Sequence, residues 1–296
     1  MDKDKKLFSF RKNEFPLILA IVAMVFIVVS WMNFGPLLAF AVARIPFANW
    51  NMEGVGDYLI VHTPYFLMFL SLFAISNLLL KTDLRTIITG IDRKFRYKMA
   101  LKYGGIYIAY LAVLSLISFK TIDIDPTPFK QKLSYLLPVL ILTPMQALSE
   151  EIFFRALPAR IVFKNNLPKT INEGVALSIM SGMLFVIPHL GNPEVVANSE
   201  YISALAYYFI WGALAMAIGV YTDGFEIPVA IHIANNLYTA LFVNYEGGAM
   251  PTHALFINRK ATPSNWITVV EAIIIFAILF FVAYKSKKKE NGGLDG

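Results

Sequence analysis

The sequence contains no cysteine. This absence excludes disulfide bonds, catalytic thiolates and metal sites with cysteine ligands. Charged residues are also scarce, since they make up 16% of the 296 residues, whereas soluble domains carry about 25%. Hydrophobic residues reach 57% and are gathered into long runs. This composition indicates a chain whose solvent is largely lipid.

Eight apolar runs approach the length of a membrane-spanning helix, which needs about 20 residues because each residue adds only about 1.5 Å of rise. We expect spans at 16–42, 58–80, 103–119, 133–154, 174–189, 201–221, 227–243 and 266–284. The first run is long enough to need a tilt or a kink at Gly35-Pro36. The runs are continuous rather than alternating, which favours helices over a β-barrel. The expected fold is an all-α polytopic membrane protein with about eight transmembrane helices, in a single domain over residues 1–296.

Basic residues fall mainly on one side of the expected membrane. Most of the 26 lysines and arginines lie in the N-terminal arm, after the second and fourth spans, and in the C-terminal tail. Because basic loops tend to stay in the cytoplasm, this distribution predicts a multi-pass protein of the cell membrane with both termini cytoplasmic. Contact with anionic lipid explains the net charge of +6. We therefore expect the lipid bilayer as a partner and no nucleic acid.

Charged side chains inside a span cost about 2.5–3.5 kcal/mol each, so they often mark function. The fourth run ends in Glu150-Glu151 and, four residues further on, Arg155. Glu151 and Arg155 are spaced to pair on one helix face, which would leave Glu150 free to act as a general base. The alternative interpretation is the membrane–water boundary, where charges are ordinary.

Histidines and asparagine stand out in two further runs. His189 lies near the end of the fifth run, four residues after Phe185. His232 and Asn236 are also four residues apart and share a face of the seventh run. Alternatives are an interface role for His189 and interhelical hydrogen bonding for the other two residues. For the remaining histidines, His62 and His253, structural or surface roles are favoured.

As a set, Glu-Glu-x-x-x-Arg, Phe-x-x-x-His and His-x-x-x-Asn on helices four, five and seven resemble the CPBP family of intramembrane proteases. This family, also called the CAAX protease and bacteriocin-processing or Abi family, includes the CAAX-prenyl endopeptidases. The resemblance covers about 133–243, the expected catalytic core. It implies that Glu150 and His189 activate a water molecule for attack on a peptide carbonyl. His232 and Asn236 would donate hydrogen bonds to the resulting oxyanion.

The resemblance also implies supporting roles and a substrate. Glu151 and Arg155 would fix the helix and the charge state of Glu150. The substrate would be a membrane-anchored or lipidated protein or peptide, hydrolysed without a metal or another cofactor. Ala156 and Pro188 stand where the family commonly has a glycine and a small residue.

Three other functions remain compatible with the sequence. A non-proteolytic scaffold, immunity or regulatory protein of the same family would need the helices but not the chemistry. A zinc-dependent membrane protease could use Glu150, His189 and His232 as ligands, although the sequence lacks the compact His-Glu-x-x-His motif. A transporter is the third alternative, although no inverted repeat is visible.

Overall fold

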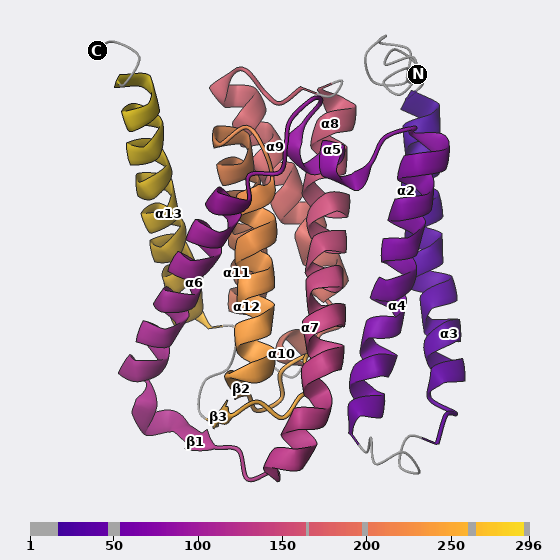
Figure 1. Cartoon of the computed structure of the whole chain (residues 1–296), viewed down its shortest axis with the longest axis vertical. Helices are drawn as coiled ribbons and strands as arrows, with labels where there is room; N and C mark the ends of the chain where they lie inside the picture. Colours follow the sequence, from indigo (N-terminus) through magenta and orange to yellow (C-terminus); the bar gives the residue numbers. More distant parts are fainter. Residues whose placement is uncertain (1–16, 47–53, 164–165, 197–200, 260–264, 293–296) are drawn as a thin grey trace.

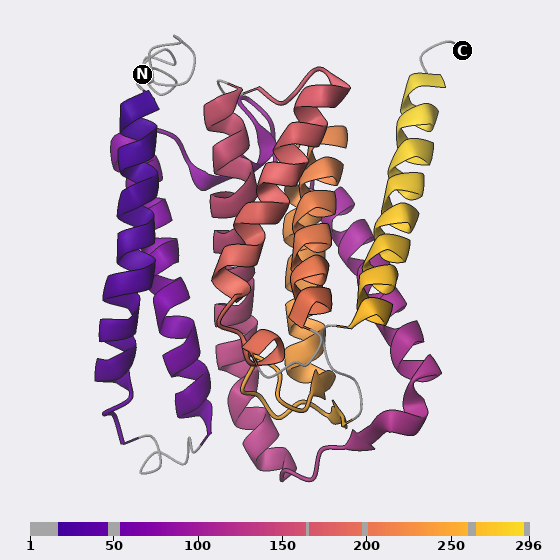
Figure 2. The same ribbon diagram turned by 180° about the vertical axis from the view of Figure 1, so that it is seen from behind.

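The computed structural model describes residues 17–46, 54–163, 166–196, 201–259 and 265–292. Its long helices run side by side in a bundle (Figure 1). The pair α2 and α4 forms one edge of the bundle and α13 forms the opposite edge (Figures 1 and 2). The start of α2 and the end of α13 lie at the same end of the bundle. The basic N-terminal arm used in predicting the orientation lies outside the described residues.

The helices are interrupted by short π-helical and 3₁₀ segments. The α-helices are α2 (Leu17–Val29), α3 (Gly35–Val42), α4 (Val55–Ala74), α5 (Leu84–Thr89), α6 (Tyr97–Ile117), α7 (Phe129–Glu151), α8 (Leu157–Val162), α9 (Ile171–Val186), α10 (Pro193–Val196), α11 (Tyr201–Tyr221), α12 (Glu226–Leu241) and α13 (Trp266–Gly292). The π-helical segments are Ser30–Phe34, Ile75–Leu79 and Ile152–Ala156, and the 3₁₀ segments are Phe119–Thr121 and Ile187–His189.

The expected all-α membrane class is confirmed, but the number of eight spans is not. Within the described residues, seven helices are long and apolar enough to cross a membrane. They are Ile18–Val42, Val55–Leu79, Tyr97–Ile117, Phe129–Val162, Ile171–His189, Tyr201–Tyr221 and Trp266–Lys288. The expected span at 227–243 corresponds to α12, which has 16 residues. At about 1.5 Å per residue, α12 falls short of a bilayer core of about 30 Å.

A small sheet closes one end of the bundle, and the sequence did not indicate it. Strand β3 (Phe256–Asn258) pairs antiparallel with β1 (Ile122–Ile124) and parallel with β2 (Val243–Tyr245). The sheet lies below the end of α12, at the same end of the bundle as the first turns of α7 (Figure 1). Each strand has only three residues, too few to produce an alternating pattern that a sequence could display. The sheet brings the segment after α6 to the segment after α12.

The fourth span continues past its two glutamates through the π-helical segment Ile152–Ala156 into α8. Pro158 lies in the first turn of α8 and has no backbone N–H, so the carbonyl of Phe154 cannot receive its usual helical hydrogen bond. The hydroxyl of Ser181 on α9 donates to that carbonyl at 3.5 Å. Such π-helical turns often occur at functional sites. Here the turn follows Glu151 directly and carries Arg155.

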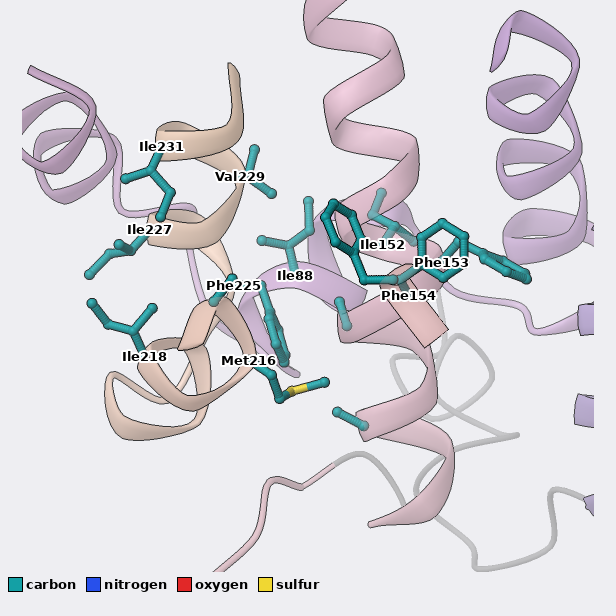
Figure 3. Close-up of a cluster of buried hydrophobic side chains, with 14 of the residues drawn as sticks. Ile88, Ile152, Phe153, Phe154, Met216, Ile218, Phe225, Ile227, Val229 and Ile231 are labelled. Carbon is teal, nitrogen blue, oxygen red and sulfur yellow. The ribbon is translucent and has the colours of Figure 1, made fainter. Parts of the chain in front are cut away.

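The apolar core holds this turn against α11 and α12. Phe153 and Phe154 are buried in it, together with Ile88 from α5 and Phe225 from the turn before α12. Figure 3 shows Ile88 lying between the α12 side chains and the phenylalanines of the π-helical turn. The core therefore fixes the relative positions of the two segments that bear the glutamate motif and His232.

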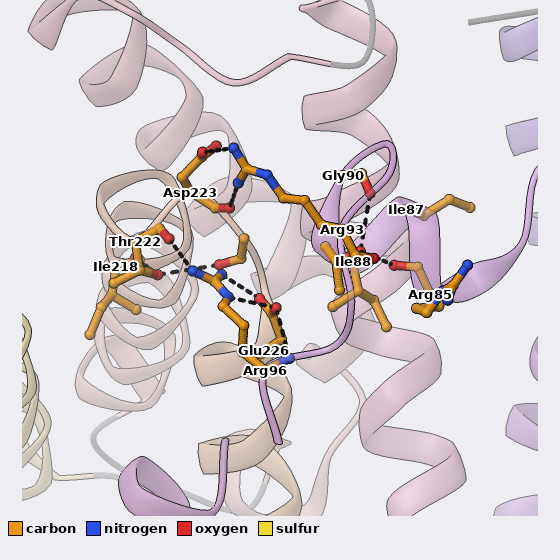
Figure 4. A network of polar contacts seen from close by, with 12 residues as sticks. Arg85, Ile87, Ile88, Gly90, Arg93, Arg96, Ile218, Thr222, Asp223 and Glu226 are labelled. Atoms are coloured by element: carbon orange, nitrogen blue, oxygen red, sulfur yellow. Dashed lines mark hydrogen bonds and ion pairs between the residues drawn. The ribbon is translucent and has the colours of Figure 1, made fainter. Parts of the chain in front are cut away.

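Buried ion pairing anchors the start of α12. The carboxylate of Glu226 is fully buried and accepts hydrogen bonds from Arg96 Nε at 2.8 Å and Nη2 at 2.6 Å (Figure 4). Arg96 Nη1 also donates to the Thr222 carbonyl at 2.8 Å. Next to it, Arg93 pairs with Asp223 in the turn between α11 and α12. The segment preceding α6 thus holds this turn, and with it the register of α12.

Two glycines let α9 and α11 approach closely. These helices lie against each other (Figure 2). A Cβ atom added to Gly212 would come within 2.8 Å of Phe185 Cβ and 3.1 Å of Gly182 Cα. A Cβ added to Gly182 would lie 2.8 Å from the Phe209 carbonyl oxygen. Small residues at such crossings are typical of membrane helix packing.

The Gly212→Ala substitution should therefore destabilise the protein. Overpacking costs about 1–3 kcal/mol, more than alanine gains in helix propensity. Gly105→Ala on α6 is the matched control, because a Cβ there would meet nothing within 4 Å. Thermal unfolding in detergent should give a lower midpoint for Gly212→Ala and an unchanged or higher midpoint for Gly105→Ala. Equal midpoints would contradict the close packing of α9 and α11.

Candidate active site

A buried charge cluster joins α7 to α12. Glu151 pairs with Arg155 four residues later on the same helical run, as the spacing predicted. The same oxygen, Glu151 Oε1, lies 2.7 Å from Nδ1 of His232. The side chains of Glu151 and Arg155 are completely buried, and His232 is nearly so. Glu151 therefore binds a cation on its own helix and an imidazole 81 positions away in the sequence.

Aromatic rings complete the environment of Arg155. Its guanidinium carbon lies 4.2 Å from the ring centre of Phe185 and 5.1 Å from that of Trp211. Its Nε donates to the Gly212 carbonyl at 3.4 Å. A planar cation stacked on rings can satisfy charge and packing together, which suits arginine better than lysine. Arg155 thus ties the glutamate motif to both α9 and α11.

Glu150 lies on the other side of the His232 ring. Its Oε2 is 3.8 Å from His232 Nε2, while its Oε1 accepts a hydrogen bond from Gln146 Nε2 at 3.2 Å. The two adjacent glutamates therefore flank one imidazole, Glu151 at Nδ1 and Glu150 at Nε2. Because the carboxylate of Glu151 accepts from Nδ1, the Nε2 atom is the one that His232 presents towards Glu150.

His189 is held by its own helix end. The α-helix α9 stops at Val186 and continues as the 3₁₀ turn Ile187–His189, which contains Pro188. The His189 Nδ1 atom lies 2.7 Å from the Phe185 carbonyl oxygen, so the proton of a neutral ring is on Nδ1 and Nε2 is left as an acceptor. The ring stacks on Tyr208 with centres 3.9 Å apart.

Asn236 lies one turn after His232 on α12. Its Oδ1 accepts from the amide of Asn235 at 3.0 Å, so Nδ2 is the group that it can offer to a ligand. Asn235 Oδ1 in turn accepts from Tyr107 on α6 at 3.3 Å. The indole N–H of Trp211 donates to the same tyrosine hydroxyl at 3.4 Å. This chain of hydrogen bonds orients the asparagine pair.

All four residues predicted to be catalytic line one cavity of about 370 Å³, namely Glu150, His189, His232 and Asn236. The cavity lies between α4, α7, α9, α11 and α12, and the β2 segment contributes to its wall. Burial raises the pKa of the Tyr245 phenol in that wall to about 12, so it remains a hydrogen-bond donor at neutral pH. Three motifs on separate helices thus face one space.

Several other polar residues of this wall were not predicted. They include His62, Gln146, Asn192, Glu194, Asn235 and Tyr245. His62, for which the sequence favours a structural role, is buried in the cavity wall with Nδ1 2.9 Å from the Tyr58 carbonyl oxygen. A histidine inside an apolar run was the available signal. His253 lies apart from these residues, with Nδ1 2.9 Å from the Thr127 hydroxyl.

The zinc alternative requires three ligand side chains around one point. Among the described residues, no group of three or more histidine, cysteine, aspartate or glutamate side chains is arranged to hold a metal ion. The set Glu150, His189 and His232 therefore shares a cavity without forming a three-ligand cluster.

Replacement of Arg155 by lysine should destabilise the protein although it keeps the charge. Lysine cannot stack as a plane on Phe185 while it bonds both Glu151 and the Gly212 carbonyl. The loss of one hydrogen bond to a charged group costs about 2 kcal/mol. The control is Arg259→Lys, whose side chain is 46% exposed and pairs with an exposed aspartate; its free energy of unfolding should change by less than about 0.5 kcal/mol. Equal free energies of unfolding for the two variants would show that the hydrogen bonds and ring stacking of Arg155 do not stabilise the protein.

Comparisons with known proteins relate this chain to a protease family. Residues 132–238 match a family model described as "Type II CAAX prenyl endopeptidase Rce1-like". A protein of Bacillus subtilis (strain 168) that carries the name "Uncharacterized protein YyaK" is 25% identical over 275 residues, which cover 86% of this chain and 88% of the relative. No solved structure matches the chain. The resemblance that the three motifs predict is thus confirmed: the segment that holds the site is similar to the Rce1-like endopeptidases of the CPBP family.

Proposed function

We propose that this protein is an intramembrane endopeptidase that hydrolyses a peptide bond in a membrane-anchored or lipidated substrate. The observation that carries the proposal is the convergence of Glu150, His189, His232 and Asn236 on one cavity. The match to a CAAX-type protease family supports the reaction class, and the seven apolar helices support a multi-pass membrane protein. We assign it to the cell membrane with both termini cytoplasmic, following the distribution of basic residues.

In the proposed reaction, Glu150 and His189 activate a water molecule. Glu150 is nearly fully buried and one of its oxygens is held by Gln146, so the carboxylate presents a fixed geometry to the cavity. The Nε2 lone pair of His189 is the second acceptor, because Nδ1 is held by the Phe185 carbonyl. Positioned bases of this kind accelerate such reactions by about 10²–10⁴-fold.

His232 and Asn236 stabilise the oxyanion formed when water attacks the carbonyl carbon. Asn236 supplies its Nδ2 group. His232 needs a proton on Nε2 to donate, in addition to the Nδ1 proton directed at Glu151, so this role requires the imidazolium form. Each oxyanion donor contributes about 2.7–4 kcal/mol to the lowering of the barrier.

Transfer of the proton that Glu150 took from water to the leaving group completes the reaction. The tetrahedral intermediate collapses as the C–N bond breaks, and the nitrogen of the departing peptide takes the proton from the Glu150 carboxylic acid. One water is consumed, and the products are a peptide with a new carboxylate and a peptide with a new amine. Neither a covalent enzyme intermediate nor a redox step is involved.

Proteolysis by purified protein tests the proposal. Lipidated and soluble peptide libraries are incubated in detergent with wild type, Glu150→Ala and His189→Ala. Matched controls are Glu246→Ala, an exposed glutamate, and His253→Ala, a histidine outside the cavity. We expect cleavage by wild type and both controls, and losses of about 10²–10⁴-fold in the two cavity variants, since each removes a proton acceptor.

The other outcomes separate the rival functions. Cleavage retained by folded Glu150→Ala contradicts the proposed base. Loss of wild-type activity with a chelator, restored by zinc, points to the metalloprotease. The absence of cleavage of any peptide by wild type contradicts the enzyme and supports the non-proteolytic scaffold.

A further inference from the structure

The cavity contains buried polar atoms without partners. Within the described residues, Glu150 Oε2 and Glu194 Oε2 have no hydrogen-bond partner, and both side chains line the cavity. Both atoms are carboxylate oxygens, which accept hydrogen bonds and donate none when the group is ionised. A ligand that brings a hydrogen-bond donor to these oxygens is therefore favoured over one that cannot.

Glu194 is the carboxylate of the cavity wall that the proposed reaction does not use. It lies on the short helix α10, and about nine-tenths of its surface is buried. Its Oε1 accepts two hydrogen bonds, one from the Tyr208 hydroxyl and one from Asn192 Nδ2 at 2.9 Å. Two donors on one oxygen hold the carboxylate in place and leave Oε2 to accept from another group.

The charges around the cavity do not balance. Two carboxylates line it, Glu150 and Glu194, whereas no lysine or arginine of the described chain does. The guanidinium of Arg155, which stacks on the cavity residues Phe185 and Trp211, is paired with Glu151. His232 lies 3.8 Å from Glu150, and no ion pair with Glu194 occurs within the described residues. A buried carboxylate without a cation is unfavourable, so the balancing charge can come from the ligand.

We propose that Glu194 forms a cation-binding subsite of the cavity, which accepts an ammonium or guanidinium group of the peptide substrate. This inference rests on the proposed peptidase function and adds to it the chemistry of the preferred substrate: a lysine or arginine side chain, or a free N-terminal amine, within reach of the scissile bond. The same charges disfavour a peptide that places a carboxylate there. Sites built to bind a buried polar group discriminate strongly against analogues that lack it.

Matched peptides test the subsite. One position at a time is set to lysine, norleucine or glutamate, each with a free or an acetylated N-terminus, and kcat/KM is measured for wild type. We expect one position at which lysine exceeds norleucine by at least about 10-fold, with glutamate the poorest. If the bound cation is instead the N-terminal amine, acetylation of the N-terminus lowers kcat/KM, and exchange of lysine for norleucine leaves kcat/KM unchanged.

Glu194→Gln is the informative variant, because glutamine keeps the shape and removes the charge. We expect it to reduce the ratio of kcat/KM between the lysine and norleucine peptides to within about 3-fold, mainly through KM. Glu246→Gln is the matched control and should keep the wild-type ratio. A Glu194→Gln protein that is slower on all peptides, with an unchanged ratio, would make Glu194 a positioning residue for Tyr208 and His189 and overturn the subsite.

The outcomes for subsite and peptidase are distinguishable. If wild type cleaves lysine and norleucine peptides equally at every position, irrespective of acetylation, the subsite is wrong and the peptidase stands. If no peptide is cleaved, binding of the same peptides with a fluorescent label is measured. A preference for lysine that Glu194→Gln removes would then support the subsite without the peptidase, and equal binding would overturn both.

Discussion

The pairing of Glu151 with Arg155 and His232 is the interaction on which the arrangement of the bundle depends. The side chains of Glu151 and Arg155 are completely removed from solvent. In such surroundings an unpaired carboxylate or guanidinium is strongly unfavourable, so partners must come from neighbouring helices. Arg155 stacks on the rings of Phe185 and Trp211 and donates a hydrogen bond to the Gly212 carbonyl. Glu151 bonds to His232. One cluster therefore connects α7, α9, α11 and α12.

Surrounding features place these helices so that the cluster can form. The π-helical turn Ile152–Ala156 carries Arg155 towards α11. Gly212 removes the side chain that would otherwise hold α9 and α11 apart. At one end of the bundle, Arg96 and Glu226 fix the start of α12, and at the other end the small sheet fixes the chain that follows it. Because both ends of α12 are held, His232 meets Glu151 and Asn236 faces the cavity.

Part of this structure could be predicted from the sequence. Apolar runs located the seven long helices, because their signal depends on composition alone. Helical spacing predicted the Glu151–Arg155 pair, and polar groups placed in apolar runs indicated the candidate site residues. The pairing of Glu151 with His232 could not be predicted, because spacing within a helix says nothing about contacts across 81 positions. Three-residue strands leave no periodic signal in a sequence. The apolar run over α12 resembles a span in the sequence, although the helix has only 16 residues, and this explains the expectation of eight spans. Glu194 lies in a short helix outside the motifs, where no pattern marked it as part of the cavity.

Glu151 and His232 stabilise each other across two helices. A double-mutant cycle with Glu151→Gln, His232→Gln and the double variant measures this directly, with the free energy of unfolding in detergent as the readout. We expect a coupling energy of about 1–3 kcal/mol, because either single substitution removes the same buried interaction. Additive effects, with a coupling energy near zero, would contradict this pairing and show that apolar packing alone arranges α7 and α12.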